Sequence, residues 1–116
     1  MMETTTVRIV RKKVGQPAVE AHIGSGLDPM QSEVGGLIEA VWLNRDGLTL
    51  YCNEEGLLRG LPRNVGLGVP LDAPLRTLWL HGDLFVGGVD AEGDSRSLTD
   101  DEVAYAMRLF ALAIPT

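Results

Sequence analysis

The sequence contains one cysteine, Cys52, and a cysteine thiolate is a strong candidate for nucleophilic catalysis. Such a reaction needs a nearby base, for which the chain offers only His22 and His81. However, Cys52 follows Leu50 at strand spacing and has no basic neighbour in sequence to lower its pKa. A free cysteine in this setting is usually a buried thiol. We therefore predict that Cys52 is inert, and we keep a small enzyme using Cys52 as an alternative.

Two adjacent carboxylates, Glu54 and Glu55, are a second source of possible acid–base chemistry. Neighbours in sequence point apart on a strand and diverge on a helix, so the two are poorly placed to act on one substrate. Asn53, directly before them, is a good helix N-cap residue. We predict a solvated pair that begins a short helical turn after Asn53. An enzyme using Glu54 and Glu55 is the less favoured interpretation.

The acidic segment 90–101 partly matches a calcium-binding loop. Asp90, Glu92 and Asp94 alternate as the ligands of such a loop do, and Asp101 falls at the twelfth place. The glycine, however, stands at the fourth place instead of the sixth, and the last residue is Asp instead of a bidentate Glu. We predict an acidic turn with no metal, and we expect no cofactor elsewhere in the chain.

The segment between the cysteine and residue 64 is the best candidate for a binding loop. Polar residues on a loop that is held by rigid strands are a common way to build a binding site. Glycine lets a ligand approach the backbone, and proline stiffens the loop and lowers the entropy cost of binding. We predict that six residues form the rim of the main surface pocket: Asn53, Glu54, Glu55, Gly56, Pro62 and Asn64. Alternatively, they only end a strand and form a turn.

The elements that would position this loop can be read from the apolar pattern. Asp46-Gly47 between two apolar runs predicts a hairpin of 37–43 with 48–52. Strands are also predicted within 4–13, at or near a sheet edge, and in 18–23, 77–80 and 84–89. The prolines and glycines of 60–76 predict a surface loop.

Two helices are predicted from their end signals. The first has Asp28 as N-cap and Pro29 at the first helical position, and ends at the glycine pair 35–36. The second begins with a capping box of Thr99 and Glu102. Its predicted apolar stripe is Val103, Met107, Phe110 and Ala111. Together the elements predict an α+β fold with a small, mainly antiparallel sheet, on which the C-terminal helix and one short helix pack.

Length and composition indicate a single domain, residues 1–116, with an aliphatic core, because 45% of residues are hydrophobic but only 5% are aromatic. The single cysteine, the lack of a signal peptide and the lack of a long apolar run predict a cytoplasmic protein without a membrane segment. The net charge is −6, and only residues 1–23 are net basic. An acidic surface repels phosphate, so direct nucleic-acid binding is disfavoured.

Four segments resemble a family called domain of unknown function 3846: GGLIEAVWL, LTLYCNEEGLLRGLP-x-N, GDLFVGGVD and SLTDDEV. The resemblance covers residues 34–106, and the CNEEG and GLP-x-N block is its most specific part. It implies a context in bacteria, plasmids or phages, and it implies no reaction.

Three functions are open on the sequence alone. A non-catalytic module that binds a protein or small molecule predicts that Asn53, Glu55 and Asn64 converge on one pocket. An acidic mimic of nucleic acid that occupies a DNA-binding protein predicts carboxylates along one elongated face. An enzyme predicts that Cys52 is exposed beside a histidine. The binding module is the favoured hypothesis.

Overall fold

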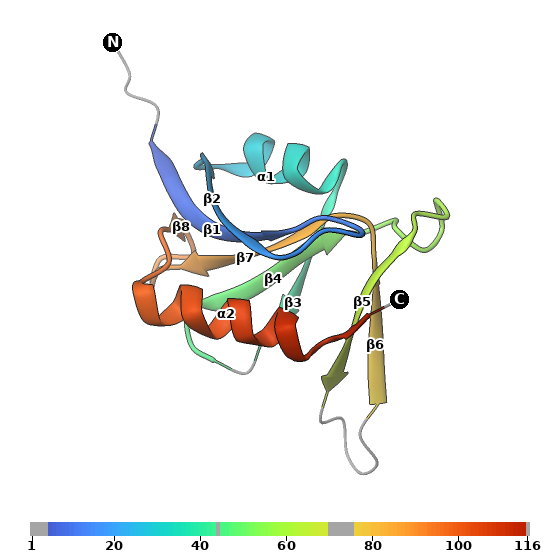
Figure 1. Ribbon diagram of the computed structural model, residues 1–116. Coiled ribbons are helices and arrows are strands. Elements are labelled where there is room, and N and C mark those ends of the chain that lie inside the picture. The colour runs from blue at the N-terminus through green and yellow to red at the C-terminus, as the bar shows by residue number, and fades with distance from the viewer. Residues whose placement is uncertain (1–4, 44, 70–75, 116) are drawn as a thin grey trace.

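The computed structural model describes residues 5–43, 45–69 and 76–115, which form two antiparallel sheets and two helices (Figure 1). The elements are β1 (Thr6–Lys12), β2 (Val19–Gly24), α1 (Leu27–Val34), β3 (Ile38–Trp42), β4 (Leu48–Asn53), β5 (Arg63–Val69), β6 (Arg76–His81), β7 (Leu84–Val89), β8 (Ser95–Arg96), α2 (Asp100–Leu112) and β9 (Ile114–Pro115). The larger sheet has the order β2-β1-β7-β4-β3 with β8 paired to β7, and the smaller has the order β6-β5-β9. This confirms the predicted fold class.

The larger sheet has α1 on one face, and α2 and the smaller sheet on the other (Figure 1). Side chains alternate between the faces of a strand, so each face has its own apolar cluster. The cluster under α1 includes Ile9, Ile23, Met30, Val34 and Phe85. The cluster on the other face includes Val10, Leu50, Leu80, Val86 and Phe110. Both clusters are largely aliphatic, as the composition predicts.

The predicted central hairpin is confirmed. β3 pairs with β4 from Ile38 opposite Asn53 to Trp42 opposite Thr49. Gly47, in the connection, has φ 78, a conformation that side chains other than glycine rarely adopt. The strands predicted at the N-terminus and at 84–89 are also confirmed, and β1 is second from the edge.

Helix α1 begins earlier than predicted. Its N-cap is Gly26, which has φ 109 and makes no side-chain cap, so the assignments of Asp28 as N-cap and of Pro29 to the first helical position were both wrong. Because Gly26 can take this conformation, the chain enters the helix directly after it, and Asp28 lies within the first turn. A carboxylate in that position is stabilised by the helix dipole. The predicted stop is confirmed, since Gly35 is the left-handed C-cap with φ 77.

Helix α2 has the predicted capping box. The Thr99 side chain accepts a hydrogen bond from the Glu102 amide at 3.2 Å, and the Glu102 carboxylate accepts one from the Thr99 amide at 2.9 Å. The predicted apolar stripe is only partly correct. Phe110 is buried, but Met107 is 37% exposed, because the buried face follows residues four apart, 102, 106 and 110. Neither helix of the described residues is long and apolar enough to cross a membrane.

The loop predicted at 60–76 is wrong for residues 63–69, which form β5 and pair with β6, whereas residues 70–75 of this prediction lie outside the described residues. Gly66 and Gly68 are residues of this strand, whereas Gly60 lies in the turn before it. A side chain at Gly66 would come within 2.9 Å of the Trp79 ring, which lies against the β5 backbone. The guanidinium of Arg63 lies 4.6 Å from the centre of the same ring. Glycine here makes room for an aromatic ring and does not mark a turn.

Candidate functional site

Asn53, the last residue of β4, is buried and holds the next turn in place. Its Nδ2 donates to the carbonyl of Val34 at 3.1 Å, and its Oδ1 accepts from the Glu55 amide at 2.8 Å. The second bond confirms that Asn53 caps the turn that follows. Because the first bond reaches the end of α1, Asn53 fixes this turn relative to both the sheet and the helix.

The turn of residues 54–60, called here the Leu-Leu turn, is closed by its own backbone. The Arg59 amide donates to the Glu55 carbonyl at 2.8 Å, and the Leu61 amide donates to the Gly56 carbonyl at 2.9 Å. Gly56 is buried, and a Cβ atom there would lie 3.0 Å from the His81 carbonyl, so the turn packs directly on β6. Its outer side exposes Leu57 and Leu58, which are 74% and 89% accessible.

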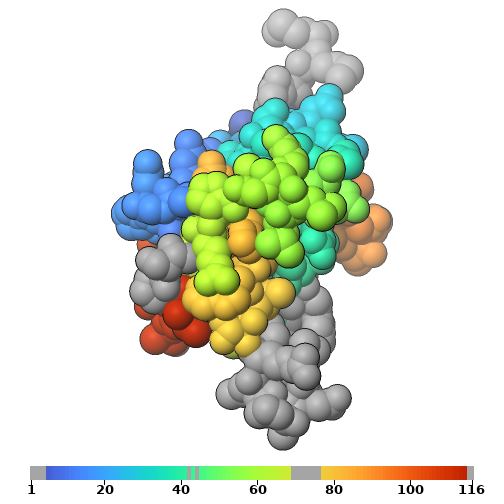
Figure 2. Space-filling view, turned by 90° about the vertical axis from the view of Figure 1, so that its right-hand side faces the viewer, coloured from blue at the N-terminus to red at the C-terminus, as the bar shows by residue number. Residues whose placement is uncertain are grey.

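The Leu-Leu turn projects at one end of the molecule, between β4 and β5 (Figure 1), and this end faces the viewer in Figure 2. Its yellow-green atoms lie beside the yellow atoms of β6 and the cyan atoms of α1 and the residues after it. This end therefore presents apolar side chains on a backbone that is tied to three elements. The sequence analysis did not identify Leu57 and Leu58. The only sequence signal for them is the pair of adjacent leucines in EEGLLRG. Such a pair does not match the apolar spacing of a buried strand or helix face.

Asn64 is 3% exposed and cannot contact a ligand at the surface. Its Nδ2 donates to the Lys12 carbonyl at 2.8 Å and to the Gly82 carbonyl at 2.9 Å. Its Oδ1 accepts from the Lys12 ammonium at 3.0 Å. The assignment of Asn64 to a pocket rim was therefore wrong. The side chain instead joins β5 to β1 and to the turn before β7.

The remaining predicted residues do not share one rim. Asn53, Glu54 and Gly56 line a pocket of about 130 Å³ that we call the β3–β6 pocket. Pro62 lines a different pocket of about 360 Å³, next to Asp83 and Glu33. Glu55 is exposed within the Leu-Leu turn and lines neither pocket. The convergence of Asn53, Glu55 and Asn64 that was predicted for a binding module is thus not observed, although part of the segment does line a pocket.

The β3–β6 pocket lies between the larger and the smaller sheet. It is lined by Glu39 and Val41 of β3, Cys52 and Asn53 of β4, Glu54, Gly56 and Leu57 of the turn, and Leu78, Trp79, Leu80 and His81 of β6. Most of these side chains are apolar, and two carboxylates and an imidazole stand among them. The residues from β6 could not be placed here from the sequence, because the packing of the smaller sheet is a long-range contact.

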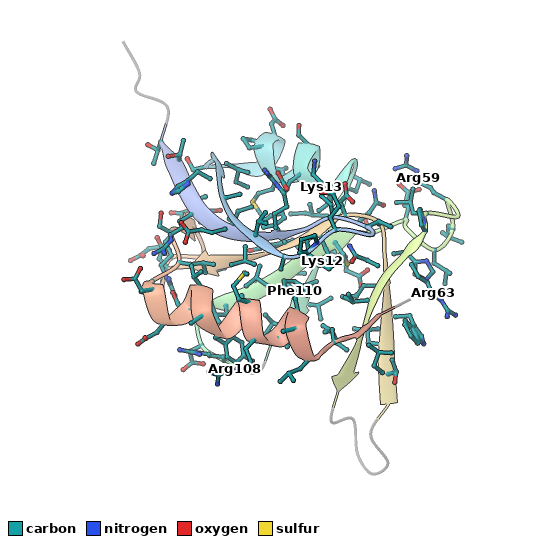
Figure 3. The ribbon with its side chains drawn as sticks, in the orientation of Figure 1. Lys12, Lys13, Arg59, Arg63, Arg108 and Phe110 are labelled. Carbon is teal, nitrogen blue, oxygen red and sulfur yellow. The ribbon has the colours of Figure 1, made fainter. Side chains whose placement is uncertain are left out.

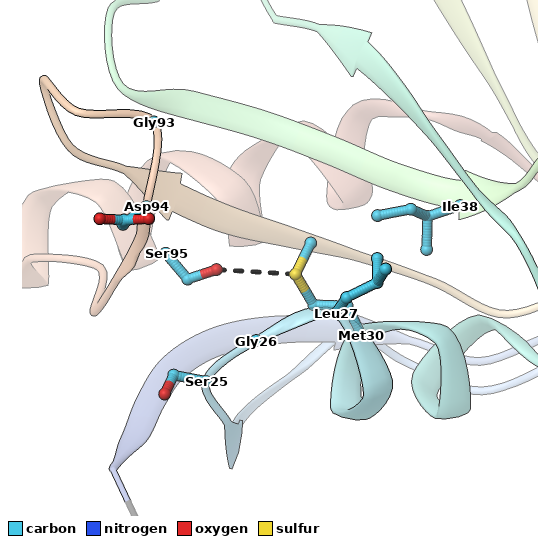
Figure 4. A pocket seen from close by; sticks show the side chains of 8 residues that line it. All are labelled: Ser25, Gly26, Leu27, Met30, Ile38, Gly93, Asp94 and Ser95. Atoms are coloured by element: carbon cyan, nitrogen blue, oxygen red, sulfur yellow. Dashed lines mark hydrogen bonds between the residues drawn. The ribbon is translucent and has the colours of Figure 1, made fainter.

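A larger pocket of about 410 Å³, called here the α1 pocket, lies beside the N-terminus of α1 (Figure 4). Ile38 of β3 stands at one end and the segment Gly93 to Ser95 at the other. Between them, Met30 forms part of the wall, and its Sδ accepts a hydrogen bond from Ser95 Oγ at 3.6 Å. These residues come from three distant segments without a motif, so the sequence analysis did not find this pocket.

The geometry gives little support to catalysis by Cys52. The thiol is 5% exposed, and its Sγ donates to the Glu39 carbonyl at 3.8 Å. Burial, with a smaller contribution from the Glu39 charge, raises the pKa of Cys52 to about 11. Burial and the raised pKa therefore disfavour the thiolate form that a cysteine nucleophile needs. His81 lines the same pocket, but its Nδ1 lies 2.9 Å from the Leu61 carbonyl.

Within the acidic segment 90–101, residues 90–94 form a compact turn ahead of β8 and α2. One carboxylate oxygen of Asp90 accepts hydrogen bonds from the amides of Glu92 and Asp94, both at 2.9 Å. That oxygen is used by the turn's own backbone. Among the described residues, no three His, Cys, Asp or Glu side chains are grouped so that they could hold a metal ion.

Basic side chains gather at the end of the molecule that carries the Leu-Leu turn, as Lys12, Lys13, Arg59 and Arg63 show (Figure 3). They do not converge on one point. The Lys12 ammonium donates to Asn64, Arg59 donates to the Gly35 carbonyl at 3.1 Å, and Arg63 stacks on Trp79. Three of the four cations are thus directed to different neighbours and not to a shared point.

The family model described as Domain of unknown function (DUF3846) matches residues 6–111, nearly the whole chain. No curated protein and no solved structure matches the chain.

Proposed function

The chain belongs to the DUF3846 family, and we propose that it is a non-catalytic binding module whose protein or small-molecule partner contacts the Leu-Leu turn and the β3–β6 pocket. The observation that carries this proposal is the pair of leucines, 74% and 89% exposed, on a turn that is fixed at both ends. We further propose that the module acts in the bacterial cytoplasm and belongs to a bacterium, a plasmid or a phage.

Exposed leucines on an ordered turn are a favourable binding surface. Burying a leucine side chain stabilises a complex by roughly 1.5–3 kcal/mol. Because Asn53 and Gly56 already hold the backbone of the turn, little conformational entropy is lost when a partner packs on it. Leu57 also lines the β3–β6 pocket, so a partner that covers the turn can extend into that pocket. The pocket favours a protein segment or a small, mainly apolar group.

The two other functions have weaker support. A nucleic-acid mimic needs free carboxylates along one face, but Glu20, Glu33, Asp100 and Glu102 form ion pairs with arginines. Basic side chains also occupy one end of the molecule (Figure 3). An enzyme using Cys52 would need a thiolate, which the raised pKa disfavours. These observations favour the binding module over the two alternatives.

Replacing both leucines tests the proposal. The variant Leu57→Ser with Leu58→Ser should bind a partner, captured from a bacterial lysate and then purified, at least about tenfold more weakly than wild type. The fold should not change, because neither side chain is buried. The matched control is Leu112→Ser, since Leu112 is 78% exposed in α2. The measurement is the Kd of the purified partner for the three proteins at equal thermal midpoints. Equal affinity for all three would rule out the Leu-Leu turn as the contact surface.

A further inference from the structure

Strand β3 has a free edge in the described part of the chain. It pairs with β4 on one side only, and no described strand pairs with the other side. The Glu54 amide donates to the Leu37 carbonyl at 2.8 Å, which makes Leu37 and Glu54 a hydrogen-bonded pair. Because such pairs alternate along an antiparallel ladder, the backbone groups of Ile38, Ala40 and Trp42 point away from β4. These groups are available to another strand.

The two pockets described above lie on opposite faces of the sheet beside this edge. Ile38 lines the α1 pocket (Figure 4), and Glu39 and Val41 line the β3–β6 pocket. Side chains of a strand alternate between the faces of its sheet. A strand that paired with β3 would therefore direct alternate side chains toward the two pockets. Backbone pairing at an edge combined with pockets for alternate side chains is how strand addition achieves affinity and specificity.

The charges beside the edge of β3 are negative and favour a basic partner. Glu39 and Glu54 line the β3–β6 pocket, and Asp94 lines the α1 pocket. All three are exposed, and none forms an ion pair among the side chains that the structure describes. Lysine or arginine on the added strand would neutralise them. Pairing of two copies of this chain through β3 is disfavoured, because it would bring two acidic edges together.

We infer that the partner contributes an extended segment, with apolar residues at alternate positions and with lysine or arginine, that pairs with β3 as an additional strand. This inference rests on the proposed function and names its partner as a basic protein segment. The Leu-Leu turn lies beside the same pocket, so it would contact the segment where it leaves the edge.

The probe is a library of random twelve-residue peptides displayed on phage, selected on the wild-type protein. Selected peptides should alternate apolar residues, contain lysine or arginine and lack proline. The test variant is Ala40→Pro, which removes the outward amide of β3, a change that an edge strand tolerates. The matched control is Ala40→Val, which changes the side chain but keeps the amide. Synthetic forms of the selected peptides should bind Ala40→Pro about tenfold more weakly and bind Ala40→Val like wild type.

Further outcomes separate this inference from the proposed function. Peptides that lose affinity for Leu57→Ser with Leu58→Ser, but not for Ala40→Pro, would overturn strand addition and leave the proposed function intact. Peptides that lose affinity for Ala40→Pro, but not for Leu57→Ser with Leu58→Ser, would support strand addition. They would count against the Leu-Leu turn as a contact surface. Failure to enrich any peptide, or enrichment without alternation, would overturn the inference. A wild-type dimer in sedimentation that Ala40→Pro converts to a monomer would identify a second copy as the occupant instead.

One measurement does not depend on the folding of a variant. In the wild-type protein, a bound peptide should slow hydrogen exchange of the Ala40 amide at least about tenfold, because that amide becomes hydrogen-bonded. The amide of Glu39, which faces β4, should change much less. Unchanged exchange at Ala40 with a saturating peptide would overturn strand addition.

Discussion

Buried amide side chains hold the candidate binding surface in position. Asn64 satisfies the carbonyls of Lys12 and Gly82 with one amide group and accepts from the Lys12 ammonium with its oxygen. A buried polar group without a partner costs more than an ordinary hydrogen bond contributes. The three bonds therefore tie β5, β1 and the turn before β7 together through one side chain.

The substitution Asn64→Ala should lower the free energy of unfolding by about 2–4 kcal/mol, because it leaves two carbonyls and an ammonium without their partner. Glu55→Ala, at an exposed position in the same segment, should change it by less than about 0.5 kcal/mol. Urea denaturation of the two variants measures both values. A stable Asn64→Ala protein would show that water replaces the amide and that Asn64 is free for another role.

The two asparagines differ in how well their contacts could be predicted from the sequence. The cap by Asn53 was predicted, because its acceptor atom binds an amide two residues away. The burial of Asn64 was not predicted, because one of its partners lies 52 residues away in sequence. Both residues stand in a segment rich in glycine and proline, and its composition suggests an exposed loop for either one. Local hydrogen bonds can be inferred from spacing, but long-range ones cannot.

At the scale of the element, Glu102 links the start of α2 to the central hairpin. Its carboxylate completes the capping box with Thr99 and also accepts two hydrogen bonds from Arg96, at 2.7 and 2.8 Å. Arg96 in turn donates to the Gly47 carbonyl in the hairpin connection at 3.3 Å. The hydrogen bond to Arg96, together with those of the cap, lowers the pKa of Glu102 to about 2.

This pKa gives the stability a defined dependence on pH. The folded-state pKa of Glu102 lies below its usual value of 4.5, so the stabilisation is present above about pH 4.5 and is lost as the pH falls toward 2. The variant Glu102→Gln should be less stable than wild type at pH 7, and the difference should shrink between pH 4.5 and 2. Urea denaturation across this range measures it, with the exposed Glu92→Gln as control. A constant difference would show that the Glu102 charge is not involved.

Secondary-structure elements, like the two asparagines, were predicted where the signal is local and missed where it depends on a distant contact. The hairpin and the start of α2 were predicted because Asp46-Gly47 and the Thr99–Glu102 spacing are local signals with a direct physical cause. Strand β5 was missed because Gly66 lies under the Trp79 ring of its neighbour. In the sequence, a glycine that makes room for an aromatic ring of the neighbouring strand cannot be distinguished from a glycine that allows a turn. Only the pairing of β5 with β6 distinguishes the two.

On the scale of the whole molecule, the two sheets share one core. Val65, Leu67 and Leu80 of the smaller sheet belong to the same apolar cluster as Leu50 and Val86 of the larger one. Separating the sheets would expose this cluster to water, at a cost of roughly 25 cal/mol for each Å² of apolar surface. The β3–β6 pocket, and the binding surface proposed for it, exist only while the two sheets stay together.

The chain should therefore unfold as one cooperative unit, as expected for the single domain, residues 1–116, that the composition predicted. Each sheet has its own tryptophan, Trp42 in β3 and Trp79 in β6, so single-tryptophan variants report on the sheets separately. In Trp42→Phe and Trp79→Phe, the urea midpoint from fluorescence should coincide with the midpoint from circular dichroism of the same variant. If the fluorescence of Trp79 changed at a clearly lower urea concentration than the dichroism, the smaller sheet would open first. The binding surface would then be lost before the larger sheet unfolds, and a partner bound across both sheets would restore coincident midpoints.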